Sequence, residues 1–206
     1  MKKLLTAVFF VLPLVVVAKN TPRDSMTKIK SGWELGLNNS LAFATEGNLT
    51  FYDDIVLGGR NSVSLYRNFK SLQTGLVVEG GVTGTGGGWY IAPSLVLNGR
   101  LDFNKMYLYG GGSVGYIREK PEVFLMVVGT TRTFGGIVTG VQAGTVYNLG
   151  KRFALNVEAG MKVKRISAKM TTEFFYPGHG TVINEQRVSY SDLYVPVSVG
   201  VRYKFN

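Results

Sequence analysis

The sequence predicts an all-β protein, folded as one eight-stranded antiparallel up-and-down β-barrel that crosses a membrane. Three observations support this prediction. Polar and apolar residues alternate along eight segments, the links between these segments are alternately short and long, and the bulky apolar face suits lipid. Alternation with a period of two is typical of strands that have one face in apolar surroundings.

Composition favours many short strands over helices or disorder. The 206-residue chain contains 27 glycines, 6 prolines and no cysteine, and it is 45% hydrophobic but only 17% charged. It is too apolar for a disordered chain and too rich in glycine for a helical bundle. The absence of cysteine excludes disulfides, thiolate metal sites, a cysteine nucleophile and an N-terminal lipid attachment.

The N-terminus has the pattern of a secretory signal peptide. Lys2 and Lys3 precede an apolar run over residues 4–17, which is too short for a membrane-spanning helix, and cleavage is expected after Ala18. No later segment is apolar over the length that a spanning helix needs, so a membrane crossing must use strands. The expected organisation is a signal peptide over residues 1–18, a short basic N-terminal segment over 19–31 and an outer-membrane β-barrel domain over 32–206.

Eight segments show the alternation expected of strands. The seventh is the clearest, because Leu155 and Val157 lie on one face while Asn156 and Glu158 lie on the other. The expected strands cover residues 33–43, 62–69, 72–82, 89–98, 106–117, 133–148, 153–164 and 193–205.

The links between these segments differ in length in a regular way. Short links are expected at residues 70–71, 98–105 and 148–152, long ones at 45–60, 118–132 and 166–187, and an intermediate one at 83–88. Asn98-Gly99 is the strongest turn signal and is expected to end the fourth strand. Short periplasmic turns on one rim and long loops on the other are typical of transmembrane barrels.

The composition of the two faces predicts which one points outward. A soluble barrel would also alternate, but with its apolar face inside. Here the polar face is mostly Gly, Ser, Asn and Ala, which is too small and too sparsely charged for a water-facing exterior. The apolar face carries aromatic residues near both rims, as lipid headgroup zones favour: Trp33, Phe69, Phe153, Tyr203 and Phe205 at one rim, and Phe43, Trp89 and Tyr116 at the other.

The polar face also carries a few charged residues that are expected in the lumen. They are Glu34, Glu79, Glu158, Lys162, Lys164 and Arg202. Eight strands enclose a lumen just wide enough to be filled by side chains, and glycines on this face would leave room for larger groups. Because unpaired charge is costly in such an interior, we expect these residues to pair. A structural network is one interpretation, and a gated ion path is the alternative.

The end of the chain resembles the C-terminal signal by which outer-membrane barrels are recognised for insertion. The residues that carry the match are Ser198, Gly200, Tyr203 and Phe205. Only Asn206 departs from the pattern, since most such proteins end on the aromatic residue. With the eight segments, residues 31–206 resemble the small eight-stranded outer-membrane β-barrel proteins of the OmpA and OmpX type, which have a porin-like barrel. The resemblance implies an outer-membrane location, contact with outer-membrane lipid and lipopolysaccharide, and recognition by the barrel-insertion machinery.

An enzymatic role is not supported by the sequence. Lipid A deacylase barrels are similar in size and carry a His-any-Ser pair, but here Thr181 follows the single histidine, His179, in a turn-like run. Scattered Ser and Asp residues specify no lipid A palmitoyltransferase either. The run 84–88 lacks the helix and lysine of a phosphate loop, and no nucleic-acid motif is found. We expect no catalysis, no cofactor and no metal.

The long links are the remaining functional candidates. The links 118–132 and 166–187 contain the apolar runs Pro121–Val128 and Phe174–Tyr176, which are unusual in water. Either these links are loops that bind an extracellular partner, or the strands extend past the bilayer and pair these residues in a protruding sheet, which would offer an edge for strand addition. The formal charge of +10 favours contact with anionic lipid or a solvated basic surface. We expect a structural or surface-interaction role, with a small gated channel as the alternative and a lipid A-modifying enzyme third.

Overall fold

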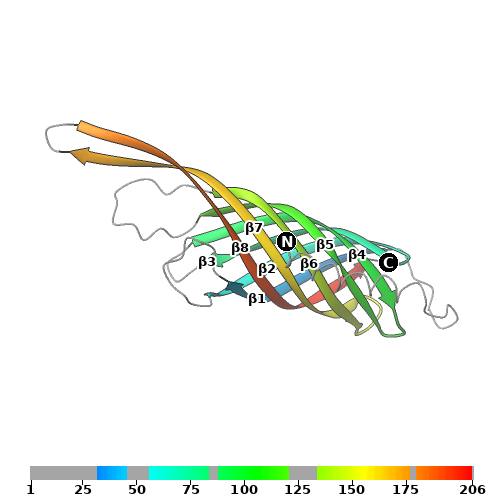
Figure 1. The fold of residues 1–206 in the computed structure, drawn as a ribbon. Coiled ribbons are helices and arrows are strands. Elements are labelled where there is room, and N and C mark those ends of the chain that lie inside the picture. The colour runs from blue at the N-terminus through cyan, green and yellow to red at the C-terminus, as the bar shows by residue number, and fades with distance from the viewer. Residues whose placement is uncertain (1–31, 46–55, 84–87, 121–133, 177–179, 206) are drawn as a thin grey trace.

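The chain forms a closed antiparallel barrel of eight strands (Figure 1). The structure is a computed structural model that describes residues 32–45, 56–83, 88–120, 134–176 and 180–205. The strands are β1 (Gly32–Thr45), β2 (Val56–Phe69), β3 (Leu72–Thr83), β4 (Gly88–Asp102), β5 (Met106–Lys120), β6 (Phe134–Asn148), β7 (Phe153–Tyr176) and β8 (Gly180–Phe205). Each strand pairs with its neighbour in chain order, and β1 closes the barrel against β8. The predicted fold class is confirmed.

Some expectations concern residues outside these described ranges. They are the signal peptide, the basic segment that follows it, the apolar run 121–128, most of the glycine-rich turn at 84–88, and His179. The expected domain boundaries therefore stay predictions. Among the described residues, no helix has the length and apolar character needed to cross a membrane.

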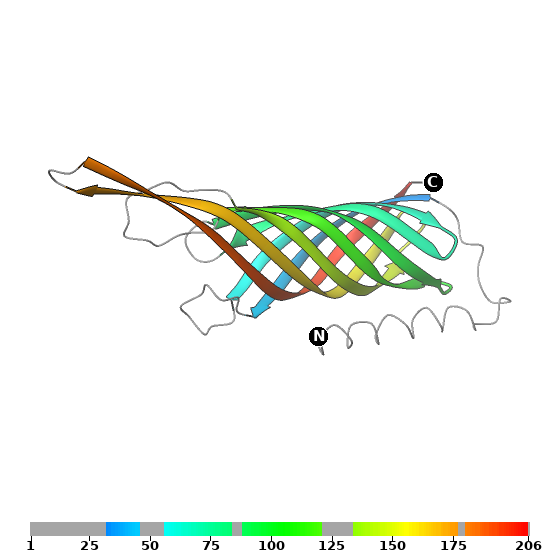
Figure 2. The same ribbon diagram turned by 45° about the horizontal axis from the view of Figure 1, so that its top comes forward.

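The strands wrap diagonally around the barrel axis (Figure 2). Following paired residues from Glu34 through each strand in turn leads to Tyr194 on β8 and then to Ala44 on β1, ten residues beyond the start. This offset, together with the strand number, sets the tilt and the diameter of the barrel. Eight strands give an interior that side chains can fill.

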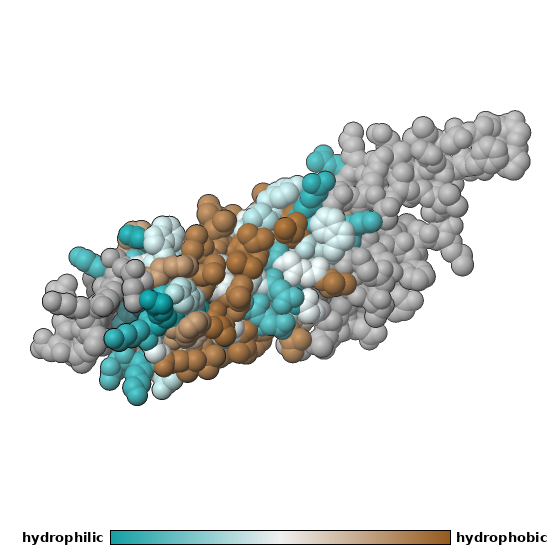
Figure 3. Space-filling view, turned by 180° about the vertical axis from the view of Figure 1, so that it is seen from behind, coloured by the Kyte–Doolittle hydropathy of each residue, from teal (hydrophilic) through white to brown (hydrophobic). Residues whose placement is uncertain are grey.

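The two faces of the strands differ as the sequence predicts. Leu95 is 66% exposed and Val157 is 47% exposed, whereas the next residues inward, Val96 and Asn156, are 5% and 0% exposed. The apolar side chains form a band around the barrel, with hydrophilic groups toward its ends (Figure 3). Such an exterior is matched to acyl chains, and the closed sheet leaves no strand edge within the band.

Aromatic side chains are exposed near both ends of the barrel. Trp33, Phe69, Phe153 and Phe205 lie near the end with the short turns, and Trp89 and Tyr116 lie near the other end. The ring of Tyr203 packs edge-on between Phe153 and Phe205, at centroid distances of 5.3 and 5.1 Å. The side chain of Phe43 is outside the described set.

The prediction of a turn at Asn98-Gly99 was wrong. β4 continues to Asp102, and residues 103–105 form the turn, where the Phe103 N–H donates to the Met106 carbonyl at 2.8 Å. Asn98 is fully buried, and its amide bonds two lumen glutamines, Gln73 at 3.1 Å and Gln142 at 3.4 Å. Burial of a satisfied amide outweighs the local turn preference of the Asn-Gly pair. The two-residue turn at Lys70-Ser71 is present, with a positive φ of 40° at Lys70.

The prediction of a long loop over residues 166–187 was also wrong, and its alternative is confirmed. β7 has 24 residues and β8 has 26, against 12 to 15 in the other strands. β8 therefore begins at Gly180 rather than Leu193, and the pair projects beyond the barrel as a two-stranded ribbon (Figure 1). We call residues 168–176 and 180–192 the ribbon. Pairing along the strands continues past the end of the barrel because it needs no support from β6 or β1.

Tyrosine rings in the lumen lie over glycines of the neighbouring strand. A β-carbon at Gly75 would lie 2.3 Å from the ring of Tyr66, and one at Gly144 would lie 2.6 Å from the ring of Tyr109. In β5 the reason differs, because a β-carbon at Gly111 would lie 2.0 Å from the Leu97 carbonyl oxygen. Glycine thus leaves space for large rings and close strands in a narrow lumen.

We predict that Gly144→Val destabilises the barrel by about 2 kcal/mol, because its side chain would clash with Tyr109 and with the Val157 carbonyl. The measurement is the free energy of unfolding by urea in lipid vesicles. Gly150→Ala is the control, since nothing lies within 4 Å of a β-carbon there. Equal stability of the two variants would contradict the packing argument.

Candidate functional site

The lumen is filled by polar and aromatic side chains that form four clusters along the barrel axis. We call them the short-turn cluster, the central cluster, the upper cluster and the rim cluster, in order from the short turns toward the ribbon. Each cluster joins strands from opposite walls of the barrel, so the pairings could not be read from neighbouring positions in the sequence.

The short-turn cluster surrounds Glu34 on β1. Its Oε2 accepts a hydrogen bond from the Tyr107 hydroxyl at 2.5 Å and lies 3.5 Å from Arg202 Nη1. Its Oε1 lies 3.7 Å from Arg100 and 4.0 Å from Lys204. One carboxylate therefore faces three cations, which is a favourable arrangement because the group is only 3% exposed.

Arg202 has no exposed surface and is held largely by tyrosines. Its guanidinium lies 4.5 Å from the ring of Tyr66 and 4.7 Å from the ring of Tyr109, and Nη1 donates to the Tyr107 hydroxyl at 2.9 Å. Its Nε and Nη2 have no hydrogen-bond partner among the described residues. The electron-rich ring faces provide part of the stabilisation that hydrogen bonds do not.

The central cluster is held by hydrogen bonds. The Tyr109 hydroxyl donates to Glu158 Oε2 at 2.5 Å and lies 2.9 Å from Asn156 Oδ1, and the Asn156 amide donates to Asn38 at 3.0 Å. Within the described ranges, no cation lies within 4.0 Å of Glu158. Glu158 is thus bound to a tyrosine rather than paired with a base.

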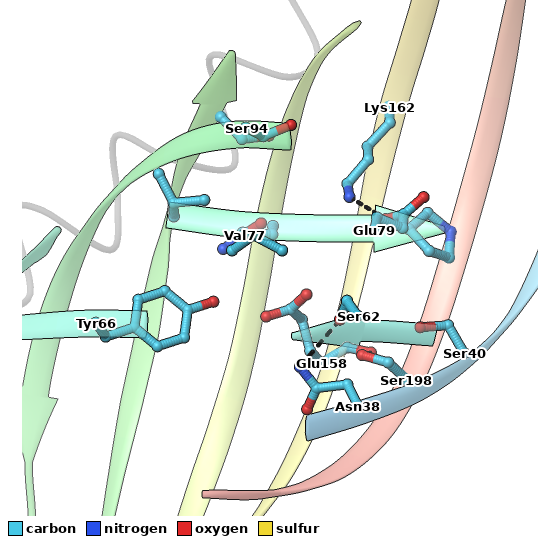
Figure 4. A pocket seen from close by; sticks show the side chains of 14 residues that line it. Asn38, Ser40, Ser62, Tyr66, Val77, Glu79, Ser94, Glu158, Lys162 and Ser198 are labelled. Carbon is cyan, nitrogen blue, oxygen red and sulfur yellow. Dashed lines mark hydrogen bonds and ion pairs between the residues drawn. The ribbon is translucent and has the colours of Figure 1, made fainter. Parts of the chain in front are cut away.

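The upper cluster surrounds Glu79 on β3. Lys162 Nζ lies 2.6 Å from Oε2, and Arg60 Nη1 lies 3.2 Å from Oε1, which also accepts from the Tyr90 hydroxyl at 2.9 Å. Figure 4 shows the lysine reaching Glu79 from the opposite wall. The Arg60 guanidinium also lies 3.9 Å from the ring of Tyr194.

The rim cluster ties the base of the ribbon to the barrel. Lys164 on β7 lies 2.9 Å from Glu119 on β5 and 3.1 Å from Asp192 on β8. The Tyr190 hydroxyl donates to Glu119 at 2.6 Å. β7 and β8 are therefore anchored to β5 at the level where they leave the barrel.

Only a very small space remains between the central and upper clusters. Small polar side chains line it, including Ser40, Ser62, Ser94 and Ser198, and Tyr66 and Glu158 close it on one side (Figure 4). Its volume is about 10 Å³, which is close to the minimum for one water molecule. This part of the lumen has no room for a hydrated ion.

All six charged residues singled out from the sequence face the lumen, but they lie in separate clusters. Arg202 lies near Glu34, Lys162 contacts Glu79, Lys164 contacts a residue not foreseen, and Glu158 contacts a tyrosine. Sequence reasoning missed Arg60, Arg100, Asp102 and Glu119, because it assigned them to links. Extending the period of two past the expected strand ends would have found them.

Other residues named from the sequence have defined positions. Ser198 lines the lumen, while Tyr203 and Phe205 form part of the exterior aromatic rim. Their recognition by insertion machinery stays a prediction. Thr181 is described by its backbone only. Among described residues, no group of three or more His, Asp or Glu side chains is placed to hold a metal ion.

Solved structures with the same architecture are outer-membrane proteins. Neisserial surface protein A (NspA) is 16% identical with a TM-score of 0.56, and the match covers 85% of this chain and 98% of that one. OprG from Pseudomonas aeruginosa is 14% identical with a TM-score of 0.54, covering 86% of this chain and 97% of that one. The chain has the eight-stranded outer-membrane barrel fold. No protein-family model matches its sequence, and no curated protein sequence does.

The outer-membrane barrel fold and the chemistry of the surface agree. The exterior band is apolar, the rims are aromatic, and the charges are turned inward. This is the arrangement that a barrel needs in a lipid bilayer, and it supports an outer-membrane location.

We predict that Arg202→Met destabilises the barrel by about 3 kcal/mol, because it removes a cation and a hydroxyl partner from the buried Glu34 site. Urea unfolding in lipid vesicles measures the loss. The control is Arg67→Met on the outer rim, where the guanidinium lies 5.1 Å from the Trp33 ring and a change of about 1 kcal/mol or less is expected. Glu34→Gln should recover part of the loss in the Arg202 variant, and a strictly additive double variant would contradict the coupling.

Proposed function

We propose that the protein is a non-conducting outer-membrane barrel that holds the ribbon at the cell surface for binding an extracellular partner. The observation that carries the proposal is the extension of β7 and β8 beyond the six other strands. A structural or surface-interaction role accounts for this extension, whereas a pore or an active site in the barrel would not need it.

The ribbon has two free strand edges. β7 pairs with β6 as far as Ser167, and β8 pairs with β1 from Leu193 onward. Between these limits, the described strands pair only with each other, from Ala168 with Val188 to Tyr176 with Gly180. Free edges present unpaired N–H and C=O groups, to which an extended peptide can add as a further strand. The proposed partner is therefore a protein with an exposed extended segment.

The barrel supplies a rigid base for this ribbon. Contacts of Glu119 with Lys164 and Tyr190 connect the ribbon's base to β5. Lys162, two residues earlier on β7, reaches Glu79 on β3. Side chains from both ribbon strands are thus held across the lumen, which limits the directions in which the ribbon can point and lowers the entropy lost on binding.

A conducting role has less support. Ions would have to pass the 10 Å³ space between the central and upper clusters and then the buried Glu34 and Arg202 side chains. A path would require several ion pairs to separate within a low-dielectric interior. We propose no catalysis, because the lumen carboxylates are each held by hydroxyls or cations and no nucleophile and base have been identified together.

We predict no discrete channel openings for the purified protein in planar bilayers, because the lumen is filled. The recording should stay at the baseline of the protein-free bilayer. Reproducible openings that disappear in the Glu158→Ala variant would instead establish the gated channel.

We predict that joining Ser167 to Ser189 by an Asn-Gly turn removes partner binding but leaves the barrel intact. The removed residues pair only with each other, so the free energy of unfolding should change by about 1 kcal/mol or less. Surface cross-linking in cells that carry each form measures binding, and heat-dependent migration in gels controls for folding. Partners captured equally by the shortened form would contradict the role of the ribbon.

A further inference from the structure

Two asparagines lie side by side on the lipid-facing surface of the barrel. Asn39 on β1 and Asn61 on β2 are paired in register, both are exposed, and the Asn39 amide donates to Asn61 Oδ1 at 3.0 Å. Their outward-facing neighbours are apolar, with Leu37 at 57%, Leu41 at 49% and Val63 at 50% exposure. A polar pair therefore interrupts the apolar band.

The asparagine pair leaves hydrogen-bonding groups unused. Each side-chain amide has two N–H donors and a carbonyl acceptor, and within the described ranges the bond between them is the only one that either side chain makes. The remaining donors of both residues and Asn39 Oδ1 face acyl chains, which cannot bond them. Leaving such groups in hydrocarbon is unfavourable, so the position indicates a polar partner within the membrane.

The pair lies in a shallow exterior groove of about 360 Å³. Leu37, Val63, Val199 and Val201 form its other outward-facing sides. Gly59, two residues from Asn61, is exposed, and nothing lies within 4 Å of a β-carbon there. A bulky neighbour can therefore approach the backbone closely at this place.

The depth of the pair limits what can occupy the groove. Asn39 lies seven residues after Gly32 and six before Thr45, which is the middle of β1. Polar groups of phospholipid and lipid A lie at the headgroup level, toward the ends of the strands. A protein surface is the source of hydrogen-bonding groups that remains at mid-depth.

We propose that a second copy of this barrel docks here, so that the protein forms a two-fold symmetric dimer in the membrane. An axis along the membrane normal places β1 of one copy against β2 of the other at equal depth, because Asn39 and Asn61 are directly paired. Asn61 Nδ2 of each copy then donates to Asn39 Oδ1 of the other. The free donors and the free acceptor of one pair are thus satisfied by an identical pair.

The dimer is tested by sedimentation equilibrium in detergent and by cross-linking in membranes. Replacing both residues by leucine (Asn39→Leu with Asn61→Leu) is expected to raise the dimer dissociation constant by about tenfold to a hundredfold, because two reciprocal bonds are lost. The matched control is Thr139→Leu, which removes an exposed polar group from β6 and should leave the constant unchanged.

The absence of cysteine allows single-cysteine cross-linking in the membrane. A thiol-specific linker should join Val63→Cys barrels beside the asparagine pair, but not Val114→Cys barrels on β5, which is four strands away.

Three results would overturn the dimer. They are a wild-type protein that stays monomeric at every protein-to-lipid ratio, a leucine double variant that dimerises equally well, and a monomer that retains a lipid by native mass spectrometry unless both asparagines are replaced. The ribbon-shortened barrel should dimerise like the full-length one. Failure of the dimer and failure of ribbon binding are therefore distinguishable.

Discussion

The constraint on which the structure depends is that lipid offers no hydrogen bonds to a polypeptide backbone. The chain meets it by closing β1 against β8, which leaves no free edge within the apolar band. With eight strands and an offset from Glu34 to Ala44 around the barrel, closure produces a narrow lumen. The pairing of tyrosines with glycines, the packing of serines and the grouping of charges all follow from the need to fill that space.

Charge pairing in the lumen connects stability with the display of the ribbon. Glu34, Glu79 and Glu119 each accept a hydroxyl hydrogen bond and each lie near at least one cation from another strand. Since a buried carboxylate without such partners would be strongly unfavourable, these contacts favour one register and one closed barrel. The same contacts hold the base of the ribbon, so the interior of the barrel positions its most exposed element.

Inside the membrane, polar groups are satisfied within the chain, and beyond it they are left open to a partner. Lumen amides such as Asn98 and Asn156 have neighbours on other strands. The ribbon, by contrast, keeps two free edges, and Asn39 and Asn61 keep unused donors on the exterior. The two surfaces proposed for recognition are the places where internal satisfaction is incomplete.

The sequence alone determined the strand number, the antiparallel order and the lipid-facing side, because alternation with a period of two is a local property that each segment shows independently. It also placed all six named charged residues on the inner face. It could not predict that Asn98 stays within a strand, that β7 and β8 continue as a ribbon, or that Glu158 contacts Tyr109 instead of a base. These outcomes depend on contacts between residues that are distant in the sequence, and only closing the barrel brings those residues together.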